Sequence, residues 1–549
     1  MPEYLSPGVY VEEVDRGPKP IEGVGTAMAV FIGFSEKAQL VEQGGGETLT
    51  RDLLGKPQLV TNWTQYLERF GGFASGAYMP HSVYGYFLNG GTRCYVVSVK
   101  TIPKAQAALL NGEGKAGLIA RAKQAGFDGL RLRVKVEPSP APEGGSGGKK
   151  AKGGEGSEAG AAPASGAAPF TVTVERERTS GGWSAQEVIR DVTLTELQRD
   201  DGGKMVGVAY KDNRAPQLID LVIPDASAPL ASLWPREQQQ SLTIESKLLS
   251  AATATDFQGE AVERTGVEGL EAIDDITMVV VPDLMTTMPG QKLDLHMIKA
   301  VQTMIIAHCE KMGDRVAVLD APPGLSPQAV KKWRMDAAGY DSSYAALYYP
   351  WIEVNDPVTN RPAHIPSSGH MAGVWARSDN TRGVHKAPAN EVVRGATGLA
   401  YNVTKGEQDT LNPNGVNCVR AFPGMGIRVW GARTLSSNPS WRYLNVRRLF
   451  NFVEKSIERG TQWVVFEPNE PRLWGRVRRD VSAFLNIVWR DGALFGLTPE
   501  QAFYVKCDEE TNPPESRDLG RLIIEIGMAP VKPAEFVIFR ISQWQPGAE

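Results

Sequence analysis

The sequence predicts a multidomain α/β protein whose main core is a doubly wound sheet of parallel strands. Three observations support this prediction. Strand-type and helix-type segments alternate from about residue 270, the region 101–250 is rich in strand-type runs, and a β-prone run without a neighbouring partner stands near each end of the chain. Alternation of strands and helices is typical of parallel sheets that carry helices on both faces.

The length and composition are those of a globular protein with more than one core. A single core rarely grows beyond about 300 residues. The 549 residues therefore indicate two to four domains, and the net charge of −4 does not favour nucleic-acid binding through overall charge. No basic and apolar leader opens the chain, and no apolar run approaches the roughly 18 residues of a membrane span. We expect synthesis and folding in the cytoplasm.

The first hundred residues divide into an arm and a compact unit. Residues 1–20 form the arm, in which the β-prone run 9–14 lies between two Pro/Gly turns and has no partner strand near it in the sequence. Residues 21–100 form the first part of the core. There we expect a strand, two helices and a second strand, at 26–34, 63–70, 81–88 and 93–99.

Residues 101–250 are predicted to form a β-rich inserted domain. Strands are expected at 118–122, 130–137, 170–175 and 218–223. The segment 138–169 consists almost wholly of Gly, Ala, Ser, Pro, Glu and Lys. Such a composition cannot bury enough apolar surface to fold, so this segment is predicted to be a disordered loop that points into solvent.

The strand–helix rhythm defines two further α/β regions and a second arm. In residues 251–420 we expect strands at 276–281, 315–319 and 344–349 and helices at 293–312 and 326–338. In residues 421–528 we expect strands at 427–432 and 462–466, a helix at 443–459, and a helix at 473–490 capped by Asn469. Residues 529–549 form the C-terminal arm, which contains the second unpaired β-prone run, 535–542.

The sequence contains no complete motif for binding a cofactor or a metal. The segment 112–117 fits the GxGxxG pattern, but the preceding residues 104–111 look helical and a strand follows, which reverses the order that pyrophosphate binding needs. The four cysteines form no CxxC pair, His296 and His308 lack the spacing of a zinc site, and His364 and His370 lie six residues apart in a predicted loop. No cofactor and no metal is expected.

Two strand-terminal carboxylates and one serine pair are the residues that an enzyme would use. Asp283 and Asp320 each follow a predicted strand, where they could act as acid and base but more simply cap turns. Ser367, Ser368 and His370 precede a predicted helix, a position typical of a catalytic nucleophile. The sequence contains no GxSxG elbow around these serines and no evident general base or orienting acid. An α/β hydrolase is therefore kept only as an alternative.

The region 420–480 is basic, with 12 Lys and Arg against five Asp and Glu. Arg472, Arg476 and Arg479 share one face of a predicted helix whose opposite face is apolar. The pattern is explained by a solvated helix face or by an electrostatic contact with an acidic partner. Nucleic acid would also fit the charge, but the aromatic residues fall on the apolar side, so nucleic acid is not the expected partner.

Motifs along the chain, in the same order, resemble those of contractile phage tail sheath proteins. They are 6–13 (SPGVYVEE) with the strand 25–33, 87–91 (FLNGG) with 94–97 (CYVV), 348–351 (YYPW), 366–373 (PSSGHMAG), 375–377 (WAR), 386–390 (KAPAN), 433–435 (RTL), 441–448 (WRYLNVRR) and 466–469 (FEPN). The resemblance runs through roughly 1–100 and 270–545. The inserted domain is only loosely like the variable outer domain of the family.

The resemblance implies a polymer and not an enzyme. It implies a sheath of stacked six-subunit rings around an inner tube, with a baseplate and a terminal cap as further partners, in a phage-tail-like particle that lysis can release. It also implies a subtilisin-like α/β fold for the middle domain. The serine-containing turn expected of a subtilisin-like fold corresponds to Gly369-His370-Met371-Ala372, which lacks the serine. Fold by itself does not carry activity.

The two unpaired runs are the expected contacts between subunits. Free backbone N–H and C=O groups on a strand can add to a neighbour's sheet. The residues predicted to exchange in this way are Val9, Tyr10, Val11, Glu12 and Val14 at one end and Glu535, Phe536, Val537, Ile538, Phe539 and Ile541 at the other. Arg472, Arg476 and Arg479 are the predicted contacts with the inner tube. A non-contractile scaffold or nucleic-acid-binding protein is the remaining alternative.

Overall fold

The computed structural model describes most of the chain between residues 20 and 540. The described residues are 20–44, 47–139, 169–178, 180–198, 204–211, 214–225, 228–245, 252–287, 292–357, 359 and 361–540. The predicted arm strand from Val9 to Val14, most of the segment 138–169, and Ile541 lie outside them.

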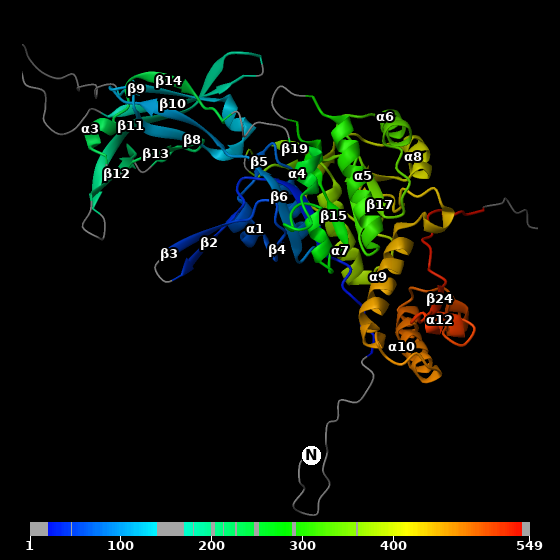
Figure 1. The fold of residues 1–549 in the computed structure, drawn as a ribbon. Helices are drawn as coiled ribbons and strands as arrows, with labels where there is room; N and C mark the ends of the chain where they lie inside the picture. The colour runs from blue at the N-terminus through cyan, green and yellow to red at the C-terminus, as the bar shows by residue number, and fades with distance from the viewer. Residues whose placement is uncertain are drawn as a thin grey trace, which may run out of the picture.

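The centre of the molecule is an eight-stranded sheet whose six inner strands run parallel (Figure 1). In spatial order its strands are β22 (Gly426–Val429), β21 (Val416–Phe422), β17 (Ala345–Tyr349), β16 (Val316–Asp320), β15 (Met278–Val280), β1 (Ala29–Ser35), β6 (Cys94–Thr101) and β4 (Gln58–Val60). The edge strands β22 and β4 pair antiparallel. Both faces of the parallel strands are buried, as such sheets require.

Helices cover both faces of this sheet. Successive side chains of a strand point to opposite faces of the sheet, so that Val30 lies in one apolar cluster and Phe31 in another. One cluster includes side chains of α4 (Ala254–Gln258), α5 (Leu295–Met312), α6 (Pro327–Lys332) and α8 (Lys405–Leu411). The other includes side chains of α1 (Trp63–Phe70), α2 (Met79–Asn89) and α7 (Ser368–Arg382). Two small sheets flank the core, β19-β18-β20 (Pro362–Ile365, Ile352–Asn355, Ala396–Leu399) and β2-β3 (Gln39–Gly44, Glu47–Asp52).

Local signals account for several of these elements. Asn62 accepts a hydrogen bond from the backbone of Gln65 and caps α1, which coincides with the predicted helix 63–70. Gly313 ends α5 in the left-handed region at φ 72°, where glycine is favoured. Ser326 caps α6, which continues as a π-helical segment (Trp333–Ala338) over the rest of the predicted helix 326–338.

A second group of strands has its own apolar core and projects away from the main sheet (Figure 1). A five-stranded sheet contains β12 (Lys204–Ala209), β11 (Trp183–Gln198), β10 (Phe170–Glu177), β9 (Leu132–Pro138) and β14 (Gln238–Ser241). A smaller sheet contains β13 (Ile219–Val222), β8 (Ala116–Gly126), β5 (Ala74–Ser75) and β7 (Lys104–Leu110), and the short helix α3 (Leu230–Leu233) packs nearby. The long strand β11 was not anticipated from the sequence.

The expected helix at 104–111 is wrong, because this segment is strand β7. Its alanines favour a helix by propensity, but they alternate with polar residues, and Ala105, Ala107 and Leu109 all point into the second core. Strand β7 pairs antiparallel with β8. Tertiary pairing therefore overrides the local preference.

The C-terminal part packs two long helices over a small sheet. Its elements are α9 (Leu444–Gly460), α10 (Pro471–Arg490), α11 (Pro499–Ala502), β23 (Phe503–Lys506), α12 (Pro514–Asp518) and β24 (Glu525–Met528). Leu449, Val477 and Phe484 lie in its apolar core.

Two sequence expectations for this part are wrong. The expected strand 462–466 is a 3-10 turn (Gln462–Val464) between the helices. Its β-prone residues have no strand to pair with, and Phe466 is fully exposed. Asn469 does not cap α10. Its side chain accepts a hydrogen bond from the Trp474 indole and donates one to the carbonyl of Arg521.

Candidate functional site

Asp283 is a buried carboxylate that binds backbone N–H groups of two remote segments and one nearby hydroxyl. It accepts hydrogen bonds from the N–H groups of Phe34 (2.6 Å), Tyr78 and Met79 (3.1 Å), and from the Thr286 hydroxyl (3.2 Å). Burial raises the pKa of Asp283 to about 7, against the effect of these hydrogen bonds. Because two of the donors open helix α2, the side chain caps that helix, which is remote in sequence, whereas the simpler interpretation of the sequence predicts a cap of the local turn.

Asp320 has the same relationship to helix α7. It accepts a hydrogen bond from the N–H of Ser368 (2.9 Å), and the Ser367 hydroxyl lies 3.5 Å away. Burial raises the pKa of Asp320 to about 6. Both serines are buried at the start of the helix, so Asp320 also serves a helix terminus.

The residues proposed for a hydrolase do not form a catalytic pair. His370 is buried, and its ring lies against Gly85 of helix α2. Burial lowers the pKa of His370 to about 3, so the imidazole is neutral at ordinary pH. Within the described ranges no hydrogen bond joins His370 to Ser367 or Ser368. A nucleophile needs a base within hydrogen-bond reach, and this geometry does not provide one.

The other candidates for chemistry have local partners. The segment 112–117 covers the turn between β7 and β8 and the first two residues of β8, and not the start of a helix. His308 lies 3.3 Å from Arg315, and His364 lies 3.5 Å from Glu353. The part of the chain that the structure describes holds no group of three or more His, Cys, Asp or Glu that could bind a metal. It also contains no helix long and apolar enough to cross a membrane.

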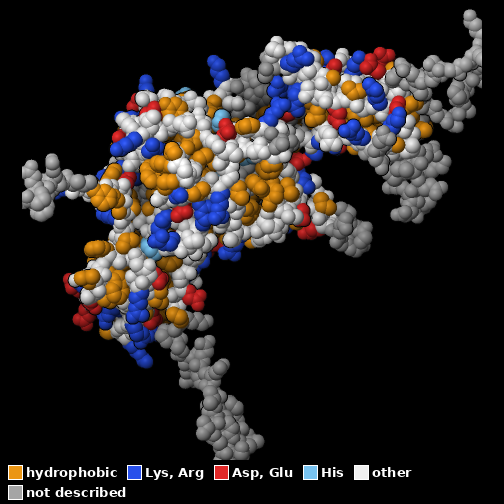
Figure 2. All heavy atoms as spheres, turned by 180° about the vertical axis from the view of Figure 1, so that it is seen from behind, with side chains coloured by type: hydrophobic (Ala, Val, Ile, Leu, Met, Phe, Trp, Pro, Cys, Tyr) orange, Lys and Arg blue, Asp and Glu red, His pale blue; other side chains and the backbone are white. Residues whose placement is uncertain are grey.

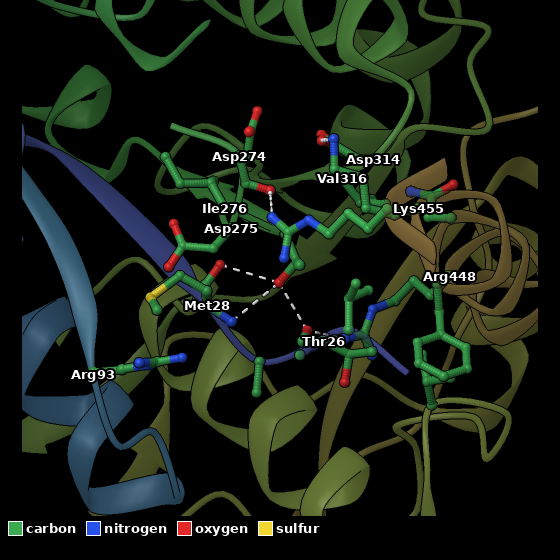
Figure 3. A pocket seen from close by; sticks show the side chains of 18 of the residues that line it. Thr26, Met28, Arg93, Asp274, Asp275, Ile276, Asp314, Val316, Arg448 and Lys455 are labelled. Atoms are coloured by element: carbon green, nitrogen blue, oxygen red, sulfur yellow. Dashed lines mark hydrogen bonds and ion pairs between the residues drawn. The ribbon is translucent and has the colours of Figure 1, made fainter. Parts of the chain in front are cut away.

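A polar cavity of about 260 Å³ lies at the amino-terminal ends of β1, β15 and β16 (Figure 3). Two cations in its walls, Lys455 and Arg459, have partners among the lining residues. Lys455 lies 3.4 Å from Asp314 and 3.2 Å from Glu458, and Arg459 donates a hydrogen bond to the carbonyl of Asp274. Residues 24–28, which lead back to the N-terminal arm, form one wall of this cavity.

Thr26 fixes this leading segment to the core. Its hydroxyl donates to Asp379 (2.7 Å), and its carbonyl accepts hydrogen bonds from Thr277 (2.7 Å) and Arg448 (3.1 Å). Arg448 and Asp379 form an ion pair and are both buried. Close by, the N–H of Val24 donates to the hydroxyl of Ser456. The root of the N-terminal arm is therefore held on helix α9.

Glu535 fixes the other end of the chain. Its carboxylate accepts hydrogen bonds from Arg433 (2.6 and 2.9 Å), Asn412 (2.6 Å) and Tyr443 (3.2 Å). Burial by itself would raise the pKa of Glu535, but the bonds from Arg433 and Asn412 lower it below its usual value.

Beyond Glu535 the chain is apolar and uncovered. The side chains of Phe536, Val537, Ile538 and Phe539 are 68–83% exposed. The described residues from Glu535 to Arg540 belong to no strand in the single subunit. An apolar segment of this kind is unusual on the surface of a soluble monomer.

A small open sheet precedes this tail in the chain. Among the described residues, β23 and β24 form a sheet of two strands. The chain after β24 runs beside Phe495, whose N–H donates to the carbonyl of Ala529 (2.8 Å). Phe495, Leu497 and Tyr504 around this sheet are exposed. Two strands alone make a marginal sheet, which favours the addition of further strands.

The basic helix face lies on α10, as predicted. Leu473, Trp474 and Val477 are buried, whereas Arg472 and Arg479 are exposed. The guanidinium of Arg476 stacks on the ring of Trp463 at 4.3 Å, and Arg479 lies 3.2 Å from Asp480. Figure 2 shows Lys and Arg side chains beside exposed hydrophobic side chains at this end of the molecule.

Sequence reasoning did not identify the residues that hold the chain ends. Arg448, Asp379 and Arg433 are buried charges, and they pair with residues remote in sequence. The available signal was a charged residue within the apolar stripe of a helix, as Arg448 stands beside Leu449. Such a position indicates a buried ion pair without naming its partner.

Two family models match the chain. One is described as the phage tail sheath protein central domain and matches residues 265–435. The other is described as the phage tail sheath C-terminal domain and matches residues 436–543. The two matches run without a break and together span more than half of the chain.

Curated relatives and solved structures give consistent similarity. A prophage major tail sheath protein of Pseudomonas aeruginosa (strain UCBPP-PA14) is 26% identical over 311 residues, which are 54% of this chain and 76% of that protein. The tail sheath protein of Vibrio phage KVP40 is 26% identical over 207 residues, 37% of this chain and 30% of that protein. The chain thus spans less than a third of the length of the second relative.

Among solved structures, the PVC sheath complex of an extracellular contractile injection system, in the contracted state, has a similar fold. It covers 99% of both chains with a TM-score of 0.54 and 23% identity.

Proposed function

The chain belongs to the phage tail sheath protein family, and on that basis we propose that it is the subunit of a contractile sheath. Copies assemble as stacked six-subunit rings around an inner tube, and the polymer shortens to drive the tube through a target envelope. The observation that carries the proposal is the exposed apolar tail Phe536–Phe539, which leaves an anchored root and lies uncovered in the single subunit.

The tail and the N-terminal arm are proposed to add as strands to a neighbouring subunit. The donors are Val9, Tyr10, Val11, Glu12 and Val14 at one end, and Glu535, Phe536, Val537, Ile538, Phe539 and Ile541 at the other. The proposed acceptor is the sheet β23-β24, because it has only two strands among the described residues and exposed apolar side chains around it. Strand addition supplies backbone hydrogen bonds that an edge strand lacks.

This kind of contact suits a polymer that changes length. A strand shared between subunits is a heterologous contact, which builds rings and helices. We propose that the shared strand stays paired while the subunits move relative to one another. An interface made of side chains alone would instead have to break and form again during contraction.

The inner tube is the proposed partner of helix α10. Arg472, Arg476 and Arg479 give this face a positive charge, and the exposed pair Val465 and Phe466 lies in the turn before the helix. Phe466 has a φ of 69°, a rare conformation for a bulky residue that clusters at functional sites. An acidic tube surface would complement the arginines.

The rest of the chain is assigned to the domains of a sheath subunit. Residues 21–100, 251–420 and 421–528 are proposed to form the sheath domains, the middle one with a subtilisin-like arrangement. The β-rich residues 101–250 form the outer domain, supported by a separate apolar core. Baseplate and terminal cap proteins are the further partners. Assembly takes place in the cytoplasm, and lysis releases the particle.

The proposal is tested by producing the chain together with its inner tube protein and examining the product by negative-stain microscopy. Sheathed tubes are expected. Deletion of residues 1–16 should leave a folded monomer that no longer polymerises, as seen by sedimentation and circular dichroism. Sheaths of full length built from the shortened chain would contradict strand exchange through the N-terminal arm.

A further inference from the structure

The roots of both chain ends meet on the first two turns of helix α9. Arg448 donates a hydrogen bond to the carbonyl of Thr26, at the N-terminal root. Asn445 donates one to the carbonyl of Val531 (3.1 Å), at the C-terminal root. Tyr443, the residue before the helix, donates to Glu535 (3.2 Å). Residues this close along a helix lie within about 8 Å of one another, whereas the two roots are some 500 positions apart in sequence.

Each root also includes a charge-assisted pair with little exposure, Arg448 with Asp379 on one side and Arg433 with Glu535 on the other. The side chains of Arg448 and Asp379 are 3% and 2% exposed. At the other root the side chain of Arg433 is 8% exposed. Breaking one partner of a buried ion pair leaves an uncompensated charge, which is strongly unfavourable. Both roots therefore resist detachment far better than surface ion pairs do.

Helix α9 is itself held in two cores. Leu444 packs in the cluster on one face of the main sheet, and Leu449 and Val453 pack in the C-terminal core. The guanidinium of Arg448 also lies over the ring of Trp375 in helix α7, at 4.8 Å. The helix joins the two parts of the subunit and cannot move without repacking both.

We infer that the start of helix α9 joins the two strand-forming ends mechanically in series. Tension on the N-terminal arm passes from Thr26 to Arg448 by two links, the carbonyl of Thr26 and its hydroxyl through Asp379. It then runs along the helix to Asn445 and Tyr443. From there it passes to Val531 and Glu535 and into the C-terminal tail. Thr26, Asn445 and Glu535 are positioning residues for this transfer. The inference rests on the proposed function, because it requires both ends to pair with neighbouring subunits.

A series connection has a distinct signature. When two anchors carry the same tension one after the other, loss of either interrupts the transfer. Loss of both then does no more harm than the more harmful single loss. Two independent anchors would instead give effects that multiply. The comparison of single and double variants therefore separates the two arrangements.

The test uses Thr26→Val, Glu535→Gln and the double variant in sheaths assembled on tubes. Thr26→Val removes the hydroxyl bound to Asp379 and leaves the Arg448–Asp379 pair intact. Glu535→Gln removes the charge and keeps the shape. The controls are Thr26→Ser, which retains the hydroxyl, and Glu113→Gln in the exposed turn between β7 and β8. Sheath length is measured by negative stain before a fixed urea pulse, and the fraction of fully contracted sheaths after it.

The expected result is sheaths of normal length in every variant. The contracted fraction should fall at least threefold for each single variant, and the double variant should match the lower of the two. Unchanged contraction, multiplied effects in the double variant, or loss of assembly by folded subunits would each overturn the inference. Failure of the unaltered chain to form sheaths counts instead against the proposed function.

Hydrogen exchange on the soluble chain provides a readout that does not depend on assembly. Glu535→Gln should raise exchange at residues 529–535 and also at the amide of Val24, which is bound to Ser456 on the same helix. A change confined to residues 529–535 would show that α9 does not couple the two roots, whatever the sheath does.

Discussion

Gly33 in strand β1 lies directly against the buried carboxylate of Asp283, and a β-carbon at position 33 would collide with Oδ2. The same oxygen accepts hydrogen bonds from the N–H groups of Phe34 and Met79. The missing side chain at position 33 thus lets one carboxylate reach both the central strand and the start of helix α2. This contact joins the sheet to the helix that covers it.

Gly33→Ala is expected to destabilise the subunit by about 2–4 kcal/mol, through overpacking and the loss of buried hydrogen bonds. Urea unfolding of a soluble chain that lacks residues 1–16 measures the change. Gly475→Ala in helix α10 is the matched control, because no heavy atom lies within 4 Å of a β-carbon there. Equal stability of Gly33→Ala and the parent chain would mean that the Asp283 carboxylate does not depend on close contact with a glycine at position 33.

Buried carboxylates and histidines make opposing contributions to the pH dependence of stability. The pKa values of Asp283 and Asp320 are raised by burial to about 7 and 6, so their contribution is largest below about pH 4 and is lost as the pH rises through these values. The pKa values of His308 and His370 are lowered by burial to about 4 and 3. Their contribution is present above about pH 6.5 and is lost as the pH falls. Between pH 5 and 8 the two effects oppose each other.

In Asp283→Asn, the pH dependence of stability should be dominated more strongly by the buried histidines. At pH 5 the variant should be less stable than the parent, because the amide N–H group of Asn would face the backbone N–H donors around position 283. Its stability should also rise with pH more steeply than that of the parent, by about 2–3 kcal/mol between pH 5 and 8. Urea unfolding at pH 5, 6.5 and 8 measures this slope, with Asp409→Asn at an exposed position as the control. Parallel slopes would contradict the raised pKa of Asp283.

The exposed tail should tolerate charge in the single subunit but not in the polymer. Phe536→Asp with Ile538→Asp changes side chains that are 71% and 79% exposed, so the melting temperature should stay within a few degrees of the parent value. Polymerisation should be lost, because strand addition would bury the new carboxylates. Sedimentation velocity measures the assembly, and Phe536→Leu with Ile538→Val serves as the matched control. Normal sheaths from the charged variant would exclude the tail from the contact.

The sequence predicts elements well where the local signal and the tertiary context agree. Helix α1 coincides with the expected range 63–70, with Asn62 as its cap. Strand β7 was mistaken for a helix because its composition, rich in alanine, outweighed its alternation of buried and exposed positions. The run 462–466 was mistaken for a strand, since a β-prone run without a partner can end in a turn.

The candidate site was predictable only in part, and for a physical reason. Strand-prone residues such as Phe536 and Ile538 can be recognised in the sequence, because they form a β-prone run that has no partner strand nearby. The anchors do not, because Arg448 and Asp379 are 69 positions apart and no periodic pattern connects them. Only the folded chain brings such charges together.

The basic face of α10 should be dispensable for folding and required for sheath assembly on tubes. Arg472→Glu with Arg479→Glu changes two exposed side chains, whereas Arg476 is left in place because it also stacks on Trp463. Reversed charges would repel the acidic surface that the arginines are proposed to meet. We expect an unchanged melting temperature and at least a tenfold loss of sheathed tubes by negative stain.

Arg190→Glu, on an exposed position of strand β11, is the control for the general effect of charge reversal. Raising the ionic strength should weaken assembly of the parent chain on tubes in the same direction, since exposed ion pairs are screened over about 8 Å at physiological salt. If the α10 variant forms sheathed tubes as long and as numerous as the Arg190 control, the tube contact lies elsewhere on the subunit.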